Sequence, residues 1–451
     1  MNRKRIWGWW FFDWAGQPYH TLLVSFIFSI YYSEVARREF MSRGLDATQA
    51  GVEAQALWGY GLAIGGAAIA ILAPILGAVA DSTGRRLPWV WFFSGMIVVG
   101  SAGLWWLTPD NPNLLQAVFF FGIGLVGLEL ATIFTNALLP SLGSRQEVGQ
   151  ISGSGFAFGY LGGLTSLAIM LIFFSEGESG TTLVGLTPPF GLDPELREGT
   201  RFVGPFTAIW YVLFMIPFAL WVKEAPGTGR PLRLGVAMGE LGRLLSNLPK
   251  RRSLLNWLLS SMLSRDALNG LYLFGGVYAG TVLGWSVTMS GIFGIIGAIS
   301  AALISWLGGH ADRRWGPKPV IIVAIVMLSL VCVIVVSMDR QSLFGVGLPP
   351  GSSLPDILFF ICGALIGGAG GAMQASSRTL TVRHTSEERA TEVFGLYALS
   401  GKATAFLAPF FIALVTDLSG SQRVGVSPLI VMFILSLILL SWVNKNGEAE
   451  Q

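Results

Sequence analysis

Charged side chains are scarce in this chain of 451 residues. Asp, Glu, Lys and Arg make up 12% of it, against roughly 25% in a soluble domain, while hydrophobic residues make up 53%. A soluble fold of this size would have too little polar surface to cover so many apolar side chains. The composition therefore excludes a soluble protein and indicates a chain that lies mostly in lipid.

Residues that bind metals or attack substrates are also few. The three histidines are spread along the chain, and the two cysteines, Cys332 and Cys362, stand inside apolar runs without metal-ligand spacing. We expect two buried thiols, no metal and no cofactor. The chain has neither the phosphate-binding Gly-x-x-x-x-Gly-Lys-Ser/Thr loop nor the Gly-x-Ser-x-Gly turn of a nucleophilic serine. These absences argue against ATP-driven pumping and against an enzyme, and a net charge of only +3 argues against nucleic-acid binding.

Apolar segments of about 20 residues, long enough to cross a bilayer, follow one another along the chain. Glycine, with 58 residues, is abundant and would let transmembrane helices approach closely. Twelve spans are predicted, at residues 9–33, 56–80, 89–107, 114–139, 151–174, 205–222, 254–280, 287–309, 319–338, 356–380, 391–416 and 427–443.

The basic residues predict the orientation of these spans. Roughly three times as many of them fall on the side of the even-numbered connections and the termini as on the other side, so both termini are predicted to be cytoplasmic. Residues 223–253 form the longest cytoplasmic connection and are expected to link two six-helix domains, residues 1–222 and 254–451. The apolar segment after the first basic residues is too long for a cleaved signal peptide, so we expect an uncleaved first span.

Two connections on the predicted cytoplasmic side repeat one pattern, about half the chain apart. In each, a glycine stands four residues before an aspartate, and glycine and basic residues follow. The glycine would let two helices touch, and the aspartate can accept hydrogen bonds from backbone N–H groups at the start of the next helix. One copy reflects no more than a turn with positive-inside topology, but two copies at this spacing indicate repeated halves in the same orientation. The first copy contains Gly77, Asp81, Gly84, Arg85 and Arg86, and the second contains Gly308, Asp312 and Arg313.

This pair of loops resembles the loop signature of the major facilitator superfamily. The resemblance covers the whole chain. It implies an all-α integral membrane fold, with twelve transmembrane helices in two pseudo-symmetric six-helix bundles around a central cavity. It also implies alternating access, with the two loops acting as gates that do not touch the solute, and a monomer as the working form.

Three further stretches narrow the resemblance. They are the Trp-Trp-Phe-Phe-Asp-Trp-Ala run that begins at Trp9, the Ser-Gly-Ser-Gly-Phe-Ala-Phe-Gly-Tyr run that ends at Tyr160, and the Phe-Gly-Leu-Tyr run that ends at Tyr397. Together they are similar to the Atg22-like, or vacuole-effluxer, branch of the superfamily, whose fungal members are associated with export of amino acids. The chain departs from that branch after Ala15 and after Asp266, both at places where a solute could bind.

Polar side chains inside the spans mark candidate positions for solute or ion binding, because charge at membrane depth is costly and usually faces a cavity or a partner. Helical spacing places the members of several groups on one helix face, and Pro18 is expected to kink the first span. The structural alternatives are a helix cap for Asp13 and ion pairs between packed helices for the other charges. The candidates are Asp13, Gln17 and His20 in span 1, Glu129 and Asn136 in span 4, Arg265, Asp266 and Asn269 in span 7, Gln374 in span 10, and Lys402 in span 11.

These residues predict a secondary transporter that moves a small polar solute, with an amino acid or related metabolite favoured, across a bacterial-type inner membrane. Arg265 and Lys402 would hold a carboxylate group of the solute. Asp13, Asp266 or both would meet an ammonium group, and Glu129 is the candidate carrier of a coupling proton.

Two other functions stay open on the sequence alone. A symporter for sugars or other neutral solutes would use the amide side chains of Gln17, Asn136, Asn269 and Gln374 as partners for hydroxyl groups. A membrane protein on the same scaffold that does not transport, such as an assembly factor or a receptor, would tolerate the loss of both gating loops.

Overall fold

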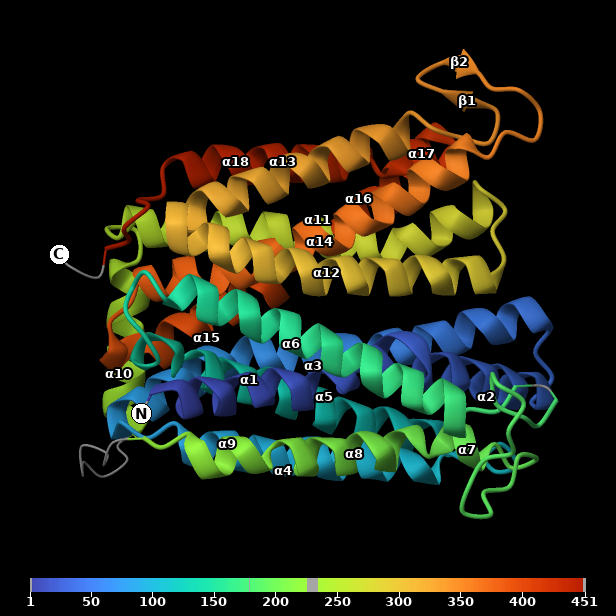
Figure 1. Cartoon of the computed structure of the whole chain (residues 1–451), viewed down its shortest axis with the longest axis horizontal. Helices are drawn as coiled ribbons and strands as arrows, with labels where there is room; N and C mark the ends of the chain where they lie inside the picture. Colours follow the sequence, from blue (N-terminus) through green and yellow to red (C-terminus); the bar gives the residue numbers. More distant parts are fainter. Residues whose placement is uncertain (1, 178, 225–233, 449–451) are drawn as a thin grey trace. The chain divides into compact units, whose positions relative to one another are not determined.

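The computed structural model describes residues 2–177, 179–224 and 234–448, and it is almost entirely helical (Figure 1). The chain divides into two compact units. Unit 1 consists of Met1–Leu72, Arg85–Thr135 and Phe158–Gly227, and unit 2 consists of Ala73–Gly84, Asn136–Ala157 and Thr228–Gln451. Unit 2 therefore includes the last turns of one N-terminal helix and the first turns of another.

In the N-terminal part of the chain, short π and 3-10 helices follow several of the α-helices. The helices of this part are α1 (Asn2–Pro18), the π-helix η1 (Tyr19–Phe26), α2 (Phe28–Ser42), α3 (Ala47–Thr83), α4 (Leu87–Gly103), η2 (Leu104–Trp106), α5 (Leu114–Asn136), η3 (Leu139–Ser141), α6 (Val148–Ile169), η4 (Met170–Phe174), α7 (Glu198–Arg201), α8 (Val203–Phe214) and α9 (Ile216–Trp221).

The C-terminal part contains the remaining helices and one short hairpin. They are α10 (Leu234–Asn247), α11 (Arg252–Thr281), α12 (Val287–Trp315), α13 (Pro317–Val336), the antiparallel strands β1 (Ser342–Leu343) and β2 (Val346–Gly347), α14 (Leu354–Arg383), η5 (Glu387–Arg389), α15 (Ala390–Ala403), α16 (Leu407–Ser419), α17 (Gln422–Gly425) and α18 (Ser427–Ser441).

Helices occupy most of each of the twelve ranges that the sequence predicts as spans. Within the described residues, ten helical segments are long and apolar enough to cross a membrane. The first span (α1, η1 and α2) and the seventh (α11) are not among the ten, because uncharged polar side chains as well as charged ones interrupt their apolar sequence. The all-α membrane fold is therefore confirmed, with ten segments rather than twelve meeting this measure.

The first span changes its helical geometry after Pro18, where the sequence predicts a kink. Pro18 is the last residue of α1, and the π-helix η1 begins directly after it. A proline has no N–H to continue the regular hydrogen-bond ladder, so the wider π turn takes its place. The hydroxyl of the buried Tyr19 donates to the carbonyl of Phe121, 2.6 Å away, and so ties this segment to α5.

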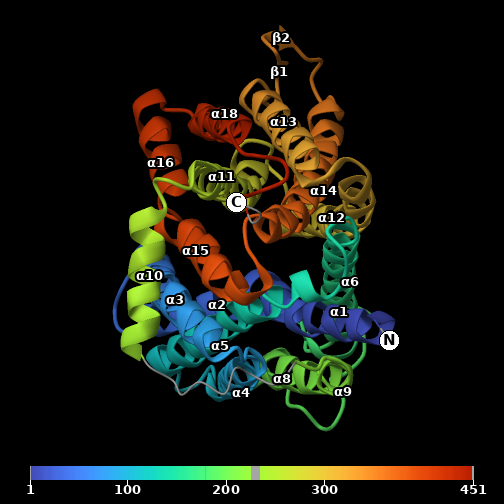
Figure 2. The ribbon, with the colours of Figure 1, turned by 90° about the vertical axis from the view of Figure 1, so that its left-hand side faces the viewer.

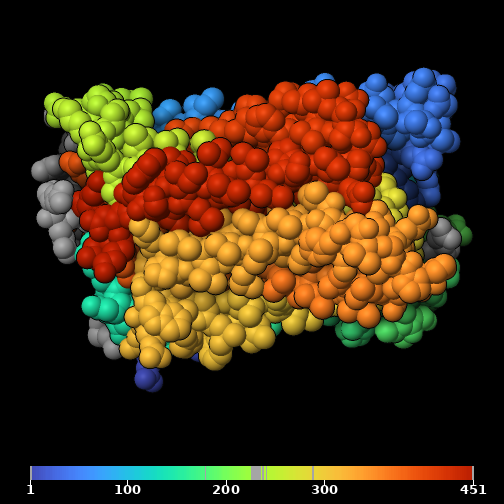
Figure 3. Space-filling model, turned by 90° about the horizontal axis from the view of Figure 1, so that it is seen from above, coloured from blue at the N-terminus to red at the C-terminus, as the bar shows by residue number. Residues whose placement is uncertain are grey.

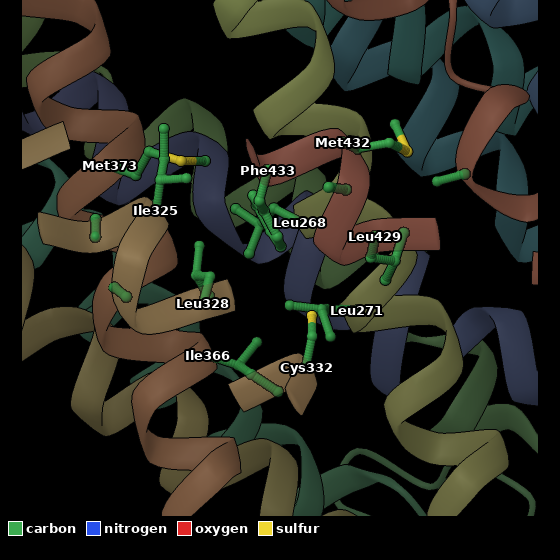
Figure 4. Close-up of a cluster of buried hydrophobic side chains, with 14 of the residues drawn as sticks. Leu268, Leu271, Ile325, Leu328, Cys332, Ile366, Met373, Leu429, Met432 and Phe433 are labelled. Atoms are coloured by element: carbon green, nitrogen blue, oxygen red, sulfur yellow. The ribbon is translucent and has the colours of Figure 1, made fainter. Parts of the chain in front are cut away.

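Hydrophobic side chains from four helices fill the centre of unit 2, shown in Figure 4. The close packing of these side chains holds α11 at a fixed position against its neighbours. The labelled residues are Leu268 and Leu271 from α11, Ile325, Leu328 and Cys332 from α13, Ile366 and Met373 from α14, and Leu429, Met432 and Phe433 from α18. Both cysteines are free and buried.

One face of unit 2 is covered with exposed apolar side chains from α13 and α18, the orange and red surfaces of Figure 3. Their spacing of three and four residues keeps them on one side of each helix. They are Val323, Val326, Leu330 and Val333 on α13, and Val431, Ile434, Leu435 and Ile438 on α18. A face of this kind suits contact with lipid tails.

The predicted linker, residues 223–253, contains a helix of its own. Residues 225–233 lie outside the described part of the chain, and α10 follows them with Leu241 and Leu244 buried in unit 2. The domain boundaries at residues 222 and 254 stay a prediction. The compact units differ from that division at the end of α3 and at the start of α6.

Candidate functional site

The eleventh span is broken near its middle. The turn at 404–406 separates α15 from α16, and Figure 2 shows them as two segments. Leu407 N donates to the carbonyl of Thr404 at 2.8 Å, so the chain turns tightly before α16 starts. Pro409 follows in α16 and cannot donate a backbone hydrogen bond. Irregular backbone at membrane depth is tolerated where protein or a cavity surrounds it, and it often marks a binding site.

Arg265 on α11 reaches the last turns of α15. Its guanidinium lies over the ring of Tyr397, 4.3 Å from the centroid, and its Nη1 donates to the Tyr397 carbonyl at 2.8 Å. It also lies directly against Gly401, where any side chain would collide with it. The next residue is Lys402, which is half-buried. The guanidinium of Arg265 therefore lies against the residue that precedes Lys402, close to the helix break.

Asp266 follows Arg265 but points elsewhere, because neighbouring side chains on a helix diverge. Only 1% of the residue is exposed, and neither carboxylate oxygen has a hydrogen-bond partner among the described residues. The Thr404 hydroxyl lies near the carboxylate, although not in good hydrogen-bond geometry, and the Arg265 charge acts on it. A buried carboxylate without hydrogen bonds is costly when it is charged.

The other candidates of unit 2 are placed differently. Asn269 is exposed on α11, Gln374 is half-buried on α14, and Asn136 is 8% exposed at the end of α5. No hydrogen bond or ring contact given for the described residues joins these three to Arg265 or Asp266.

In unit 1, two of the polar residues of α1 pack along α6 at glycines. A Cβ atom at Gly159 would lie 3.2 Å from the carbonyl oxygen of Asp13, and one at Gly163 would lie 2.9 Å from Cγ of Gln17. Both polar residues are half-buried, as is His20 in η1. Glu129 is also half-buried, on α5. The glycines bring α6 close enough to hold these side chains in place.

The first predicted gating loop caps a helix that is distant in sequence. The carboxylate of Asp81, in the last turn of α3, accepts hydrogen bonds from the backbone N–H of Glu392 at 2.7 Å and of Thr391 at 3.3 Å. These groups belong to the first turn of α15, where backbone N–H groups lack partners within the helix. A Cβ atom at Gly77 would lie 2.6 Å from the Thr391 carbonyl, so only glycine allows this approach. The sequence predicts that Asp81 caps the next helix, α4, whereas these two bonds cap the start of α15.

A different residue caps α4. Glu224, just after α9, accepts hydrogen bonds from the backbone N–H groups of Arg86, at 2.8 and 3.0 Å, and of Leu87, at 3.0 Å. A carboxylate at a helix start is favoured by the helix dipole as well as by these bonds. Gly84, at the end of α3, has φ +66, a conformation that glycine adopts readily, and Arg85 follows it.

The second gating loop also meets a helix start, but by contact instead of hydrogen bonds. Asp312 is 1% exposed and lies against Gly149 in the first turn of α6. Arg313 Nη1 donates to Oε1 of Gln150 at 2.6 Å. A Cβ atom at Gly308 would lie 3.0 Å from the Cβ atom of Ala372 on α14. Gly308 therefore does not make the close contact with a helix start that Gly77 makes in the first loop.

The next glycine, Gly309, makes the close approach to α6. A Cβ atom at Gly309 would lie 2.9 Å from the Gly149 carbonyl oxygen and 2.9 Å from Cα of Gly153. One at Gly153 would lie 2.5 Å from the carbonyl oxygen of Ser305. We refer to Gly149, Gly153, Ser305 and Gly309 as the small-residue seam between α6 and α12.

Sequence reasoning missed three residues of these sites. Tyr397 ends the Phe-Gly-Leu-Tyr run, but nothing in the sequence indicates that its ring contacts the Arg265 guanidinium. Thr404 carries no signal, because a threonine in a span is ordinary. Glu224 stands at the end of a predicted span before a basic linker, and only the fold shows that it caps α4.

Comparison with known proteins places the chain in a family. The family model described as "Vacuole effluxer Atg22 like" matches residues 1–451. The chain belongs to the Atg22-like family. It is 25% identical over 443 residues to the uncharacterized MFS-type transporter YxiO of Bacillus subtilis (strain 168), with 98% of this chain and 95% of that protein covered. It is 23% identical over 313 residues to autophagy-related protein 22 of Cryptococcus neoformans, and this match spans 51% of the length of the fungal protein and 67% of this chain.

Solved structures agree on the fold. The human organic anion transporter MFSD10 matches with a TM-score of 0.72 at 15% identity, covering 98% of this chain and 99% of that one. The proton:xylose symporter XylE matches with a TM-score of 0.69 at 13% identity, covering 98% and 96%. The Atg22-like chain is thus a multi-pass membrane transporter of the major facilitator superfamily and not an enzyme.

Proposed function

We propose that this Atg22-like protein is a secondary transporter for a small solute that carries a carboxylate, with amino acids as the favoured class. The observation that carries the proposal is the position of the Arg265 guanidinium against Gly401, the residue before Lys402, close to the break between α15 and α16. A positive charge at membrane depth is costly, and an anionic group of the solute would offset that cost.

The geometry suits recognition of a carboxylate. The ring of Tyr397 and its carbonyl hold the guanidinium of Arg265 in one orientation, and a guanidinium pairs with a carboxylate through two parallel hydrogen bonds. Lys402 supplies a second positive charge on a side chain that can move. Asp13 on α1 stays the proposed partner for an ammonium group of the solute.

The transport cycle is proposed to be alternating access. The contacts of Asp81 with the start of α15 and the small-residue seam of α6 and α12 would be formed in one state and broken in the other. The start of α15 is capped by Asp81, and its end carries Lys402, so one short helix connects the gating contact to the proposed solute site. Both termini are proposed to lie in the cytoplasm of a bacterial-type cell.

Counterflow in proteoliposomes tests the proposal. Vesicles are loaded with a mixture of unlabelled amino acids, and the entry of labelled amino acids is followed. Transient accumulation is expected for the wild type and a loss of at least tenfold for Arg265→Gln and Lys402→Gln, which keep the side-chain length but remove the charge. Arg314→Gln, a substitution at the exposed end of α12, is the matched control and should transport normally.

The opposite outcomes are equally clear. Normal counterflow in both Arg265→Gln and Lys402→Gln would show that these residues do not bind the solute. A wild-type protein that is folded but accumulates no amino acid would exclude this class of solute. The same assay would then be run with sugars.

A further inference from the structure

The buried carboxylate of Asp266 has no role in direct solute binding in this conformation. With 1% of the residue exposed, it lies beneath the surface that a solute can reach. Its two oxygens have no hydrogen-bond partner among the described residues, whereas buried polar atoms nearly always have one. Protonation of the Asp266 carboxylate is the simplest explanation for the missing partners, because it removes the negative charge and adds a hydrogen-bond donor.

We propose that Asp266 is the proton-binding residue of the transporter and that it controls the solute affinity of Arg265. This inference rests on the proposed function, since it concerns the same site. Asp266 takes up one proton to become a neutral carboxylic acid, whose O–H can donate to the nearby Thr404 hydroxyl oxygen. Release returns the same proton and restores the carboxylate.

The surroundings favour a proton over a metal ion. Hard metal cations require about six or more oxygen ligands, and within the described part of the chain Thr404 is the one neutral side chain with an oxygen that acts on this carboxylate. The charge that acts on it is that of Arg265. α18, the helix that packs most extensively on α11, has no titratable side chain. The titratable groups on the other packed helices are Glu392, Tyr397 and Lys402 on α15, Asp417 on α16, Asp356, Cys362, Arg378 and Arg383 on α14, and His310, Asp312, Arg313 and Arg314 on α12.

Coupling follows from the shared neighbour. A charged Asp266 attracts the Arg265 guanidinium and competes with an anionic solute for it. A protonated Asp266 leaves the whole charge of Arg265 to the solute carboxylate. Proton binding therefore raises the affinity for solute, and by reciprocity solute binding raises the affinity for the proton. The proton and the solute would therefore cross the membrane together, in the same direction.

The proposal also changes the part given to Glu129. That residue is half-buried and has an interaction partner. The carboxylate of Asp266 is more deeply buried and lacks hydrogen bonds. The proton therefore belongs to Asp266, and Glu129→Gln should stay coupled.

The test compares two assays in the same proteoliposomes with labelled amino acids. Counterflow without a pH gradient needs no net proton movement, whereas uphill accumulation driven by an acidic exterior does. Asp266→Asn, which resembles the protonated form, should keep at least half of the wild-type counterflow and lose gradient-driven accumulation. Its apparent affinity should no longer rise as the pH falls. Asp417→Asn, an exposed carboxylate on the adjoining α16, is the matched control and should stay coupled.

Each other result has a definite meaning. Coupled accumulation in Asp266→Asn, or loss of counterflow in the folded variant, would overturn the proposal. Wild-type counterflow without any response to the pH gradient would also overturn it, while leaving the transport function intact. If the wild type shows no counterflow, the proposed function fails, and infrared difference spectra after a pH step still test the site. A carboxylic-acid band that is present in the wild type and absent in Asp266→Asn supports proton binding, and its absence from the wild type refutes it.

Discussion

At the scale of single residues, the chain uses carboxylates as helix caps that also join distant segments. Asp46 caps α3 locally, since its Oδ1 accepts hydrogen bonds from the N–H groups of Thr48 at 2.8 Å and of Gln49 at 2.9 Å. Asp81 makes the same kind of bond to α15, more than 300 residues away. The two residues therefore separate the effect of losing a cap from the effect of losing the gating contact.

Asp81→Ala is expected to reduce transport much more than Asp46→Ala. Each substitution removes an N-cap and should cost about 0.5–2 kcal/mol of stability. Only the first also releases the start of α15 and with it the connection to Lys402. Counterflow rates and unfolding temperatures of the two variants check this. Equal transport in both variants, at equal stability, would show that the Asp81 contact is a cap without a gating role.

His384 provides a pH-dependent contribution to stability outside the spans. The ring is fully buried just after α14, with Nδ1 at 2.8 Å from the Leu380 carbonyl and Nε2 at 2.8 Å from the Ser253 hydroxyl. Burial lowers the pKa of this imidazole below its usual value near 6.5. The folded protein therefore holds the neutral ring, with a proton on Nδ1 and the Ser253 hydroxyl donating to Nε2.

The stability of the protein is consequently expected to fall at acidic pH. The unfolded chain takes up a proton at His384 before the folded chain does. The stabilisation that comes from the neutral His384 ring is complete above about pH 6.5. It is lost as the pH falls toward the lower pKa of the ring in the folded state. The unfolding temperature of His384→Gln should change less between pH 7 and pH 5 than that of the wild type. His310→Gln, at an exposed position, is the control, and the same pH dependence in all three proteins would contradict the assignment.

At the scale of helices, close packing depends on glycines at particular positions. The seam between α6 and α12 has no room for a methyl group at Gly153, because its Cβ position lies 2.5 Å from the Ser305 carbonyl oxygen. At Gly66 on α3, a Cβ atom would meet no atom within 4 Å. Both glycines lie inside helices, so an alanine gains the same helix propensity at each.

Gly153→Ala is expected to destabilise the protein by about 1–3 kcal/mol, the usual cost of overpacking. Gly66→Ala should leave the stability unchanged or raise it, because alanine favours the helix by about 1 kcal/mol. Thermal unfolding in detergent measures both. A lower unfolding temperature for Gly66→Ala than for Gly153→Ala would contradict the packing of the seam.

The positions of the helices could be predicted from the sequence, whereas the contacts between them could not. Apolar runs give the twelve ranges, and Pro18 gives the irregular first span, because both signals are local. Pro409, in the first turn of α16, is a local signal for the break at 404–406. The capping of α15 by Asp81 has no such signal, because it joins residues from opposite ends of the chain. The rarity of charge in lipid identified Arg265, Asp266 and Lys402, but their different surroundings depend on which way each side chain leaves its helix.

At the scale of the whole molecule, the proposed cycle requires contacts that form and break. Unit 2 contains one such contact between α6 and α12, in which Arg313 Nη1 donates to Gln150 Oε1 at 2.6 Å. Both side chains are long, and His310 adds a contact of 3.1 Å to Gln150 Nε2. These groups lie beside the small-residue seam, at the ends of both helices. A covalent link there would hold the seam closed.

Cross-linking Gln150→Cys to Arg313→Cys should therefore stop transport. The two cysteines are introduced into a variant without the native thiols, Cys332→Ala with Cys362→Ala. Because both native thiols are buried in unit 2, this cysteine-free variant must first be shown to transport. A short bifunctional thiol reagent with a cleavable disulfide should abolish counterflow, and a reductant should restore it. The single-cysteine variants, treated in the same way, should keep their rates. A cross-linked protein that transports at the normal rate would show that the seam stays closed throughout the cycle, and alternating access by separation of α6 from α12 would then be excluded.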